Sequence, residues 1–145
     1  GAEEITNDAL LELSVDVLAP CALDGVINSK NVNNVKAKII VEGANGPTTA
    51  EADKTLTEKG TKVVPDILAN GGGVVVSYFE WVQDVQNYDW DSDQVESIMH
   101  NTSTKAFGKV AKFAAEEKVS MRGAAMAVSV KHLEKAMLLR GLYPR

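Results

Sequence analysis

The sequence has few of the residues that build disulfides and metal centres, with one cysteine and two histidines in 145 residues. A lone Cys21 forms no internal disulfide and cannot supply the thiolates of a zinc ribbon. No uninterrupted apolar run reaches the roughly 18 residues that a membrane-spanning helix needs. The first residues lack the basic and apolar regions of a secretory signal peptide, so we expect none there. Together these absences predict a soluble, cytoplasmic protein with no membrane partner.

Basic side chains are also in the minority, with 15 Lys and Arg against 20 Asp and Glu and a net charge of −5. A large nucleic-acid footprint needs clustered basic residues that replace counterions, so we expect no nucleic-acid partner. A chain of this length can nevertheless bury a packed core without disulfides or metals to support it.

Three short, β-branched apolar runs predict strands in the first half of the chain. Turn-forming residues follow each run, as expected for strands buried on both faces of a parallel sheet. The runs begin roughly 22 to 24 residues apart, which suits a strand–helix–strand crossover. We therefore predict an α/β fold with a partial parallel sheet of about three strands, followed by an all-helical C-terminal part. The predicted strands are residues 15–18, 38–41 and 62–64.

Capping residues mark two long helices in the second half. Asp91 and Gln94 form the pattern of a capping box at the start of the first. Ser120 is the expected N-cap of the second, which ends near Arg140, before Gly141. This last helix is apolar over a wide arc, so we expect it to need partners on two sides.

A shorter helix is predicted after Pro47. Thr48 is its expected N-cap, Glu51 occupies the third helical position, and Gly60 closes it. Between the second predicted strand and this helix lies a loop of small residues.

That loop is a candidate ligand site, because ligands bind at the carboxyl ends of parallel strands, where loops meet helix N-termini. Gly43, Ala44 and Gly46 permit close approach to the backbone, and Asn45 adds an amide donor and an acceptor. The alternative is that glycine and asparagine only satisfy turn geometry. The residues themselves leave both interpretations open.

A second candidate loop follows the third predicted strand and contains Asn70 and three glycines. If a helix begins near Gly73, then Asn70, Val74 and Ser77 share one of its faces. An amide, an apolar contact and a hydroxyl would suit a small polar ligand. Taken alone, the residues favour the alternative, in which a flexible loop leads into an amphipathic helix with Ser77 in solvent.

The loop after the first strand, residues 18–23, has no titratable group other than its thiol, which indicates a smooth wall beside a flat ring. No histidine lies near Cys21 in the sequence, so we expect a buried, inert cysteine. We interpret His100 and His132 as helix-surface or packing residues, and we predict no metal site.

The sequence lacks the parts of a complete dinucleotide site. It has no Gly-x-Gly-x-x-Gly motif after a first strand and no acidic residue at the end of a second strand. No lysine or carboxylate in the candidate loops stands out as a proton-transfer group. We therefore assign no catalytic residue.

Three segments, residues 17–23, 36–49 and 64–81, resemble the glutamate dehydrogenase family. The string Glu-Gly-Ala-Asn-Gly-Pro-Thr-Thr at residues 42–49 is the most specific feature, and residues 141–144 resemble the end of bacterial and archaeal members. The similarity covers essentially all 145 residues. Relatives that act on leucine, valine or phenylalanine share the fold and usually differ in that string.

The resemblance implies that the chain is the C-terminal third of an enzyme that oxidatively deaminates L-glutamate to 2-oxoglutarate and ammonia with NAD or NADP. Residues 1–68 would form the second half of a Rossmann-like dinucleotide-binding domain. Residues 69–145 would form helices that return to an absent substrate domain. The catalytic lysine and aspartate and the glycine-rich loop would lie outside this chain, so the isolated chain would be inactive. The parent would be a hexamer.

The same resemblance implies roles for the residues of the candidate loops. The backbone at Cys21 and Ala22 would line the adenosine half of the cofactor. Gly43, Ala44 and Asn45 would lie at the nicotinamide ribose.

Asn70 would meet the nicotinamide end of the cofactor. Val74 and Ser77 would line the amino-acid pocket, where the hydroxyl of Ser77 would bind the side-chain carboxylate of glutamate.

Two alternatives remain. The chain could be a non-catalytic module that self-associates through its exposed helices and open sheet edge. It could also be part of a leucine, phenylalanine or valine dehydrogenase.

Overall fold

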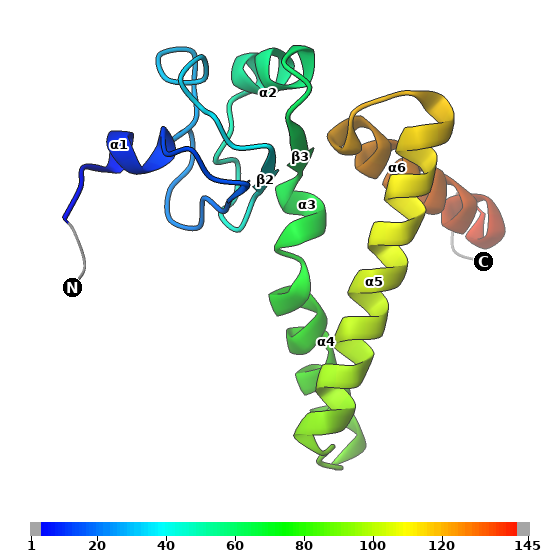
Figure 1. Cartoon of the computed structure of the whole chain (residues 1–145). Coiled ribbons are helices and arrows are strands. Elements are labelled where there is room, and N and C mark those ends of the chain that lie inside the picture. Colours follow the sequence, from blue (N-terminus) through cyan, green and yellow to red (C-terminus); the bar gives the residue numbers. More distant parts are fainter. Residues whose placement is uncertain (1–3, 142–145) are drawn as a thin grey trace. The chain divides into compact units, whose positions relative to one another are not determined.

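The computed structural model describes residues 4–141 and contains two compact units, which divide between Gly73 and Val74 (Figure 1). The expectations for the first three residues and for residues 142–145 lie outside the described part of the chain. Both predicted parts of the chain are present, because the first unit contains the sheet and the second is helical. The predicted α/β fold with a helical C-terminal part is confirmed.

The first unit is built on a parallel sheet of three strands in the order β1-β2-β3. The strands are β1 (Val17–Leu18), β2 (Ile39–Val41) and β3 (Lys62–Val64), within the predicted ranges. Three helices accompany them: α1 (Asn7–Leu11), α2 (Ala50–Glu58) and α3 (Asp66–Ala69). All three carboxyl ends therefore lie at one edge of the sheet.

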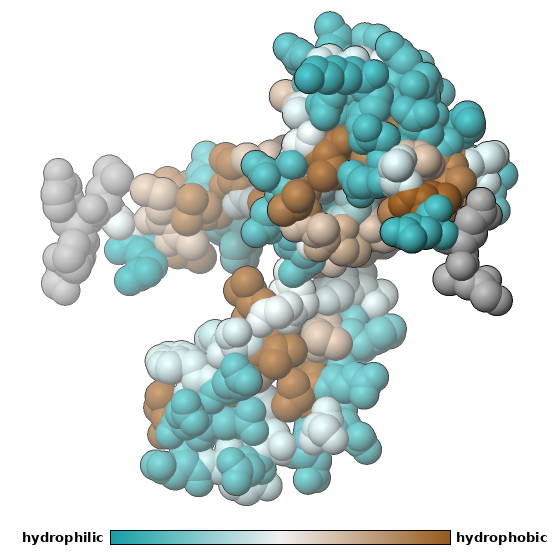
Figure 2. Space-filling model, turned by 90° about the vertical axis from the view of Figure 1, so that its left-hand side faces the viewer, coloured by the Kyte–Doolittle hydropathy of each residue, from teal (hydrophilic) through white to brown (hydrophobic). Residues whose placement is uncertain are grey.

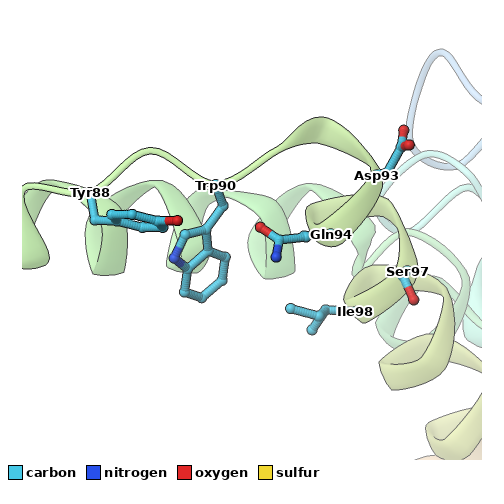
Figure 3. Close-up of a pocket in the computed structure, with 6 residues that line it drawn as sticks. All are labelled: Tyr88, Trp90, Asp93, Gln94, Ser97 and Ile98. Atoms are coloured by element: carbon cyan, nitrogen blue, oxygen red, sulfur yellow. The ribbon is translucent and has the colours of Figure 1, made fainter.

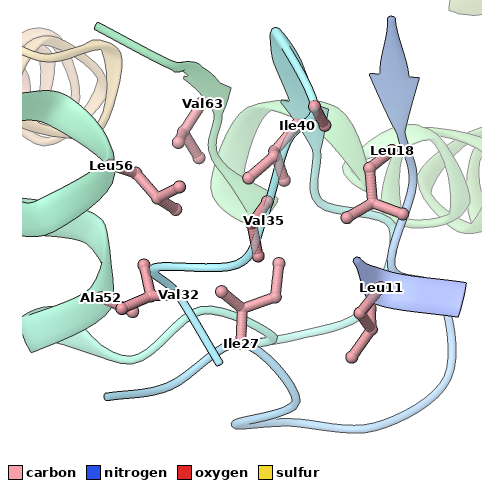
Figure 4. Close-up of a cluster of buried hydrophobic side chains, with 10 residues drawn as sticks. Leu11, Leu18, Ile27, Val32, Val35, Ile40, Ala52, Leu56 and Val63 are labelled. Carbon is pink, nitrogen blue, oxygen red and sulfur yellow. The ribbon is translucent and has the colours of Figure 1, made fainter. Parts of the chain in front are cut away.

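The core of this unit gathers on one face of the sheet (Figure 4). Leu18 pairs in register with Ile40, which pairs with Val63, so these buried side chains form one row across the strands. Leu56 and Ala52 of α2 are completely buried against it. The remaining buried members of the core are Leu11, Ile27, Val32, Val35 and Ala37.

The other face of the sheet is only partly covered, so the prediction of strands buried on both faces is wrong for this chain. Val17 is 53% exposed, and Ile39 and Val41 are half-buried. Successive strand residues point to opposite faces, so the uncovered row alternates with the buried one. Part of the apolar surface of this face is therefore exposed.

The first crossover, between β1 and β2, also departs from the predicted helix, since it consists of turns. Asparagine side chains close these turns: Asn28 Nδ2 donates to Gly25 O at 2.9 Å, and Asn31 Nδ2 donates to Val26 O at 2.7 Å. Side-chain amides that bond to nearby backbone compete with helix formation. Only the second crossover contains a helix, α2.

The N-cap of α2 is Thr49, one residue later than predicted. The Thr49 hydroxyl accepts a hydrogen bond from Ala52 N at 3.3 Å. Thr48 instead forms a parallel bridge with Ile27 and is buried, and its Oγ1 has no hydrogen-bond partner among the described residues. Gly60 closes the helix with φ +80° as predicted.

The second unit consists of α4 (Gly72–Gln86), which begins at the boundary, α5 (Ser92–Glu117) and α6 (Met121–Arg140). The predicted capping box of Asp91 and Gln94 starts α5, and the hydroxyl of Ser120 caps α6. Gly141 is itself the C-cap of α6. No helix within residues 4–141 has the length and apolar character required to cross a membrane.

Two apolar stripes remain exposed on the helices of the second unit. In each stripe the side chains recur at three or four residues, so they share one helical face. Each side chain is at least 50% exposed. In Figure 2, brown hydrophobic patches lie on the lower lobe, where Figure 1 places α4 and the first part of α5, while the lowest end itself is mostly teal and white. The stripes are Val74, Tyr78, Trp81 and Val85 on α4, and Met126, Val130, Leu133 and Met137 on α6.

The two threonines before α2 should respond differently to substitution. Thr49→Val removes the cap of α2 and should lower the free energy of unfolding by about 1 kcal/mol. Thr48→Val removes a buried, unpartnered hydroxyl and should leave stability unchanged or raise it by about 1 kcal/mol. Urea titration of the 145-residue chain measures both. A larger loss for Thr48→Val would mean that the Thr48 hydroxyl is the cap.

Candidate functional site

The candidate site lies at the carboxyl edge of the sheet, where the loops after β1, β2 and β3 meet. The backbone N–H groups of Gly43 and Ala44 donate to Pro20 O at 3.0 and 2.9 Å, which joins the β2 loop to the β1 loop. Glu42 N donates to Val64 O at 3.1 Å and joins β2 to β3. The three loops therefore form one continuous surface.

Two side chains predicted at this edge touch each other. Asn70 Nδ2 donates to Asn45 Oδ1 at 2.6 Å, and it also lies 3.4 Å from the carbonyl oxygens of Gly43 and Ala44. These residues are 25 positions apart in the sequence and belong to different loops. The bond uses the amide nitrogen of Asn70 and the amide oxygen of Asn45. Asn45 Nδ2 and Asn70 Oδ1 are left for other partners.

Cys21 is exposed, so the prediction of a buried cysteine is wrong. It lies in the loop beyond β1, outside the core, and its thiol donates to Ala19 O at 3.3 Å. Gly43 packs against it so closely that a Cβ at Gly43 would lie 2.6 Å from Cys21 Sγ. The glycine therefore allows the β1 and β2 loops to approach each other. Ala22 is exposed beside it.

Two carboxylates at this edge, Glu42 and Asp66, were not among the predicted site residues. Glu42 is completely buried, and its Oε2 accepts a hydrogen bond from Asp66 N at 2.8 Å. Asp66 Oδ2 accepts one from Gly46 N at 2.8 Å. The sequence signal for Glu42 was its position directly after a predicted buried strand. A carboxylate is costly to bury unless it is hydrogen-bonded, so an acidic residue at such a position indicates hydrogen-bond donors nearby.

The predicted substrate residues Val74 and Ser77 both lie in the first turns of α4 and are exposed. They are three residues apart and share a helical face. The prediction that Asn70 lies on the same helix is wrong, because Asn70 is the C-cap of the separate helix α3. Only Asn70 and Gly71 lie between these two helices, because Gly72 and Gly73 already belong to α4.

A family model described as Glutamate/Leucine/Phenylalanine/Valine dehydrogenase matches residues 1–141. The chain belongs to this family. A relative in this family, glutamate dehydrogenase of Thermotoga maritima, is 52% identical over 142 residues, which are 98% of the chain and 34% of the relative. The chain thus spans about a third of the length of this relative.

Solved structures of the dehydrogenase family have the same fold. The hetero-hexameric glutamate dehydrogenase of Thermus thermophilus matches 97% of the chain and 34% of its own, with 32% identity and a TM-score of 0.90. Glutamate dehydrogenase of Peptoniphilus asaccharolyticus matches 86% of the chain and 32% of its own, with 44% identity and a TM-score of 0.81.

A separate pocket of about 510 Å³ lies in the second unit, at the turn from α4 to α5 (Figure 3). Tyr88, Trp90 and Ile98 provide its apolar walls, and Asp93, Gln94 and Ser97 are its polar residues. The predicted loop residues and helix residues are not among those lining it. Across residues 4–141, no three His, Cys, Asp or Glu side chains are grouped as a metal site would require.

The contact between Gly43 and Cys21 predicts a coupled pair of substitutions. Gly43→Ala should lower the free energy of unfolding by about 1–2 kcal/mol, because the added methyl group overlaps Sγ. Cys21→Ala removes the sulfur, so the double variant should recover most of this loss. Gly108→Ala is the control, since open space surrounds that position. Urea titration of the wild type, the two single variants and the double variant measures this coupling. Additive losses in the free energy of unfolding would contradict the contact.

Proposed function

We propose that this chain is the C-terminal part of an NAD(P)-dependent glutamate dehydrogenase. The intact enzyme would oxidise L-glutamate to 2-oxoglutarate and ammonia. Residues 1–68 would complete the dinucleotide-binding domain, and residues 69–145 would return to a substrate domain outside this chain. The family match and the 52% identity to a glutamate dehydrogenase support the assignment.

The contact between Asn45 and Asn70 is the single observation that carries this proposal. A parallel α/β sheet binds ligands beyond the carboxyl ends of its strands, and this is where the two carboxamides meet. Asn45 Nδ2 and Asn70 Oδ1 offer one donor and one acceptor side by side. This set fits the ribose hydroxyls and the carboxamide of a nicotinamide nucleotide, each of which can donate and accept.

The neighbouring loops fit the rest of such a cofactor. Gly43 is exposed and bears no side chain, so a ligand can approach the backbone there. Cys21 and Ala22 are exposed and have small side chains, which suits the flat face of an adenine ring. We assign cofactor binding to Cys21, Ala22, Gly43, Ala44, Asn45 and Asn70.

Val74 and Ser77 are proposed to bind the amino acid. A hydroxyl on an exposed helical face can donate to the side-chain carboxylate of glutamate, while the valine packs against its methylene groups. Charged substrates bind strongly where such a bond is shielded from water. The substrate domain would provide that shielding.

This chain and the rest of the enzyme are assigned different roles in the reaction. When bound, the nicotinamide ring would accept the hydride from glutamate. The residues of this chain hold the cofactor and one end of the substrate in place, and such positioning lowers the barrier by fixing the reacting geometry. Proton transfer is assigned to residues outside this chain.

The assembly and location of the intact enzyme are also proposals. A similar protein, the glutamate dehydrogenase of Thermus thermophilus, is a hetero-hexamer, and we propose a hexamer here. We place the enzyme in the cytoplasm, since the only cysteine of this chain is an exposed free thiol, as a reducing compartment would maintain it.

Substrate choice can be tested with Ser77→Ala in the intact enzyme. Loss of a hydrogen bond to a carboxylate should raise KM for glutamate roughly 10- to 100-fold. Ser129→Ala, an exposed serine on α6, is the matched control and should leave KM unchanged. Steady-state rates with glutamate, leucine and phenylalanine measure the effect. A wild-type enzyme that prefers a hydrophobic amino acid, with KM insensitive to Ser77→Ala, would favour the leucine, phenylalanine or valine dehydrogenase alternative.

A second candidate, a non-catalytic module that self-associates, is favoured by the exposed stripes on α4 and α6. Such contiguous apolar surface is typical of protein interfaces. We expect the isolated 145-residue chain to self-associate and to have no glutamate oxidation activity. Light scattering and nicotinamide absorbance measure the two properties, and Leu133→Glu should reduce association. Turnover by the isolated chain would refute the proposed division of labour, and a strictly monomeric chain would refute the module.

A further inference from the structure

We propose that Glu42 and Asp66 are positioning residues that hold Asn45 and Asn70 in place for the nicotinamide half of the cofactor. This inference rests on the proposed function and names two residues beyond those assigned to the site. Each carboxylate spans from its own strand end to the backbone of the neighbouring loop.

Glu42 controls where α3 begins. Its Oε2 accepts a hydrogen bond from Asp66 N at 2.8 Å, across 24 positions of sequence. The N-cap of α3 is Pro65, which makes no side-chain cap, so this first N–H needs an acceptor from elsewhere. Glu42 is completely buried and provides it. The end of β2 thereby determines the start of the helix that ends at Asn70.

Asp66 holds the β2 loop in return. Its Oδ2 accepts a hydrogen bond from Gly46 N at 2.8 Å, and its Oδ1 accepts one from Ile67 N at 2.8 Å. Gly46 has φ +56° and directly follows Asn45. This bond therefore fixes the backbone on which the Asn45 side chain stands.

The backbone of Asp66 also fixes the second carboxamide. Its carbonyl oxygen accepts a hydrogen bond from Asn70 N at 3.0 Å. One residue thus bonds to the backbone beside Asn45 and to the backbone of Asn70 itself. The 2.6 Å contact between the two side chains requires both loops to stay in this arrangement. Apolar side chains in place of Glu42 and Asp66 could stabilise the fold. They could not accept these hydrogen bonds, so they would not set the two amides at a defined separation.

The test is a double-mutant cycle in the intact enzyme, read as the Kd of NADH or NADPH from nucleotide fluorescence. Asp66→Asn keeps one acceptor oxygen and loses the other, so we expect Kd to rise about fivefold to twentyfold. Asn45→Ala should weaken binding by a comparable factor. Because Asp66 acts through Asn45, the double variant should bind about as weakly as the weaker single variant. Independent effects that multiply would overturn the inference.

Two controls separate a positioning role from a loss of folding. Asp16→Asn removes an exposed carboxylate that pairs with Lys38 at 2.6 Å, and it should leave Kd unchanged. Hydrogen exchange should show faster exchange of the peptide containing Gly46 in Asp66→Asn, with exchange in α5 unchanged. If Asp66→Asn is unfolded at the assay temperature, Glu42→Gln carries the same cycle with Asn45→Ala, because it preserves side-chain volume and one acceptor.

The outcomes distinguish this inference from the proposed function. A wild-type enzyme that binds neither NADH nor NADPH would refute the proposed function. A wild-type enzyme that binds, with affinity reduced by Asn45→Ala and unchanged by Asp66→Asn, would refute only the positioning role.

Discussion

Parallel pairing of β1, β2 and β3 is the constraint on which the site depends. It directs all three carboxyl ends to one edge of the sheet, so that loops far apart in the sequence become neighbours. The buried row of Leu18, Ile40 and Val63 secures this register, because a slip by one residue would turn the row toward solvent. Packing in the core thus determines which loop residues can meet a ligand.

At that edge, hydrogen bonds between the loops add to the packing of the core. Hydrogen bonds from Gly43 and Ala44 to Pro20 join two loops, and the carboxylates of Glu42 and Asp66 join the second loop to the third. Burial of Glu42 strengthens such bonds, since water does not compete for the acceptor. These hydrogen bonds thus connect loops that consist largely of small residues.

Several features could be predicted from local patterns, and others could not. The three strands, the capping box of Asp91 and Gln94 and the last helix depend on residues close together in the sequence, and all are confirmed. The predictions that failed depend on neighbours distant in the sequence. Thr48 is drawn into a bridge with Ile27, so Thr49 caps α2 instead, and Cys21 is exposed because its loop passes outside the core.

The sequence by itself determined the type and order of the elements and singled out Asn45 and Asn70, because strand periodicity, caps and glycine-rich loops are encoded locally. Only the tertiary structure decided that the two carboxamides touch, that Asn70 ends one helix before another begins, and that Glu42 and Asp66 connect the loops. Those contacts join residues 20 to 25 positions apart. Their partners are selected by strand order and register, which no short pattern of residues specifies.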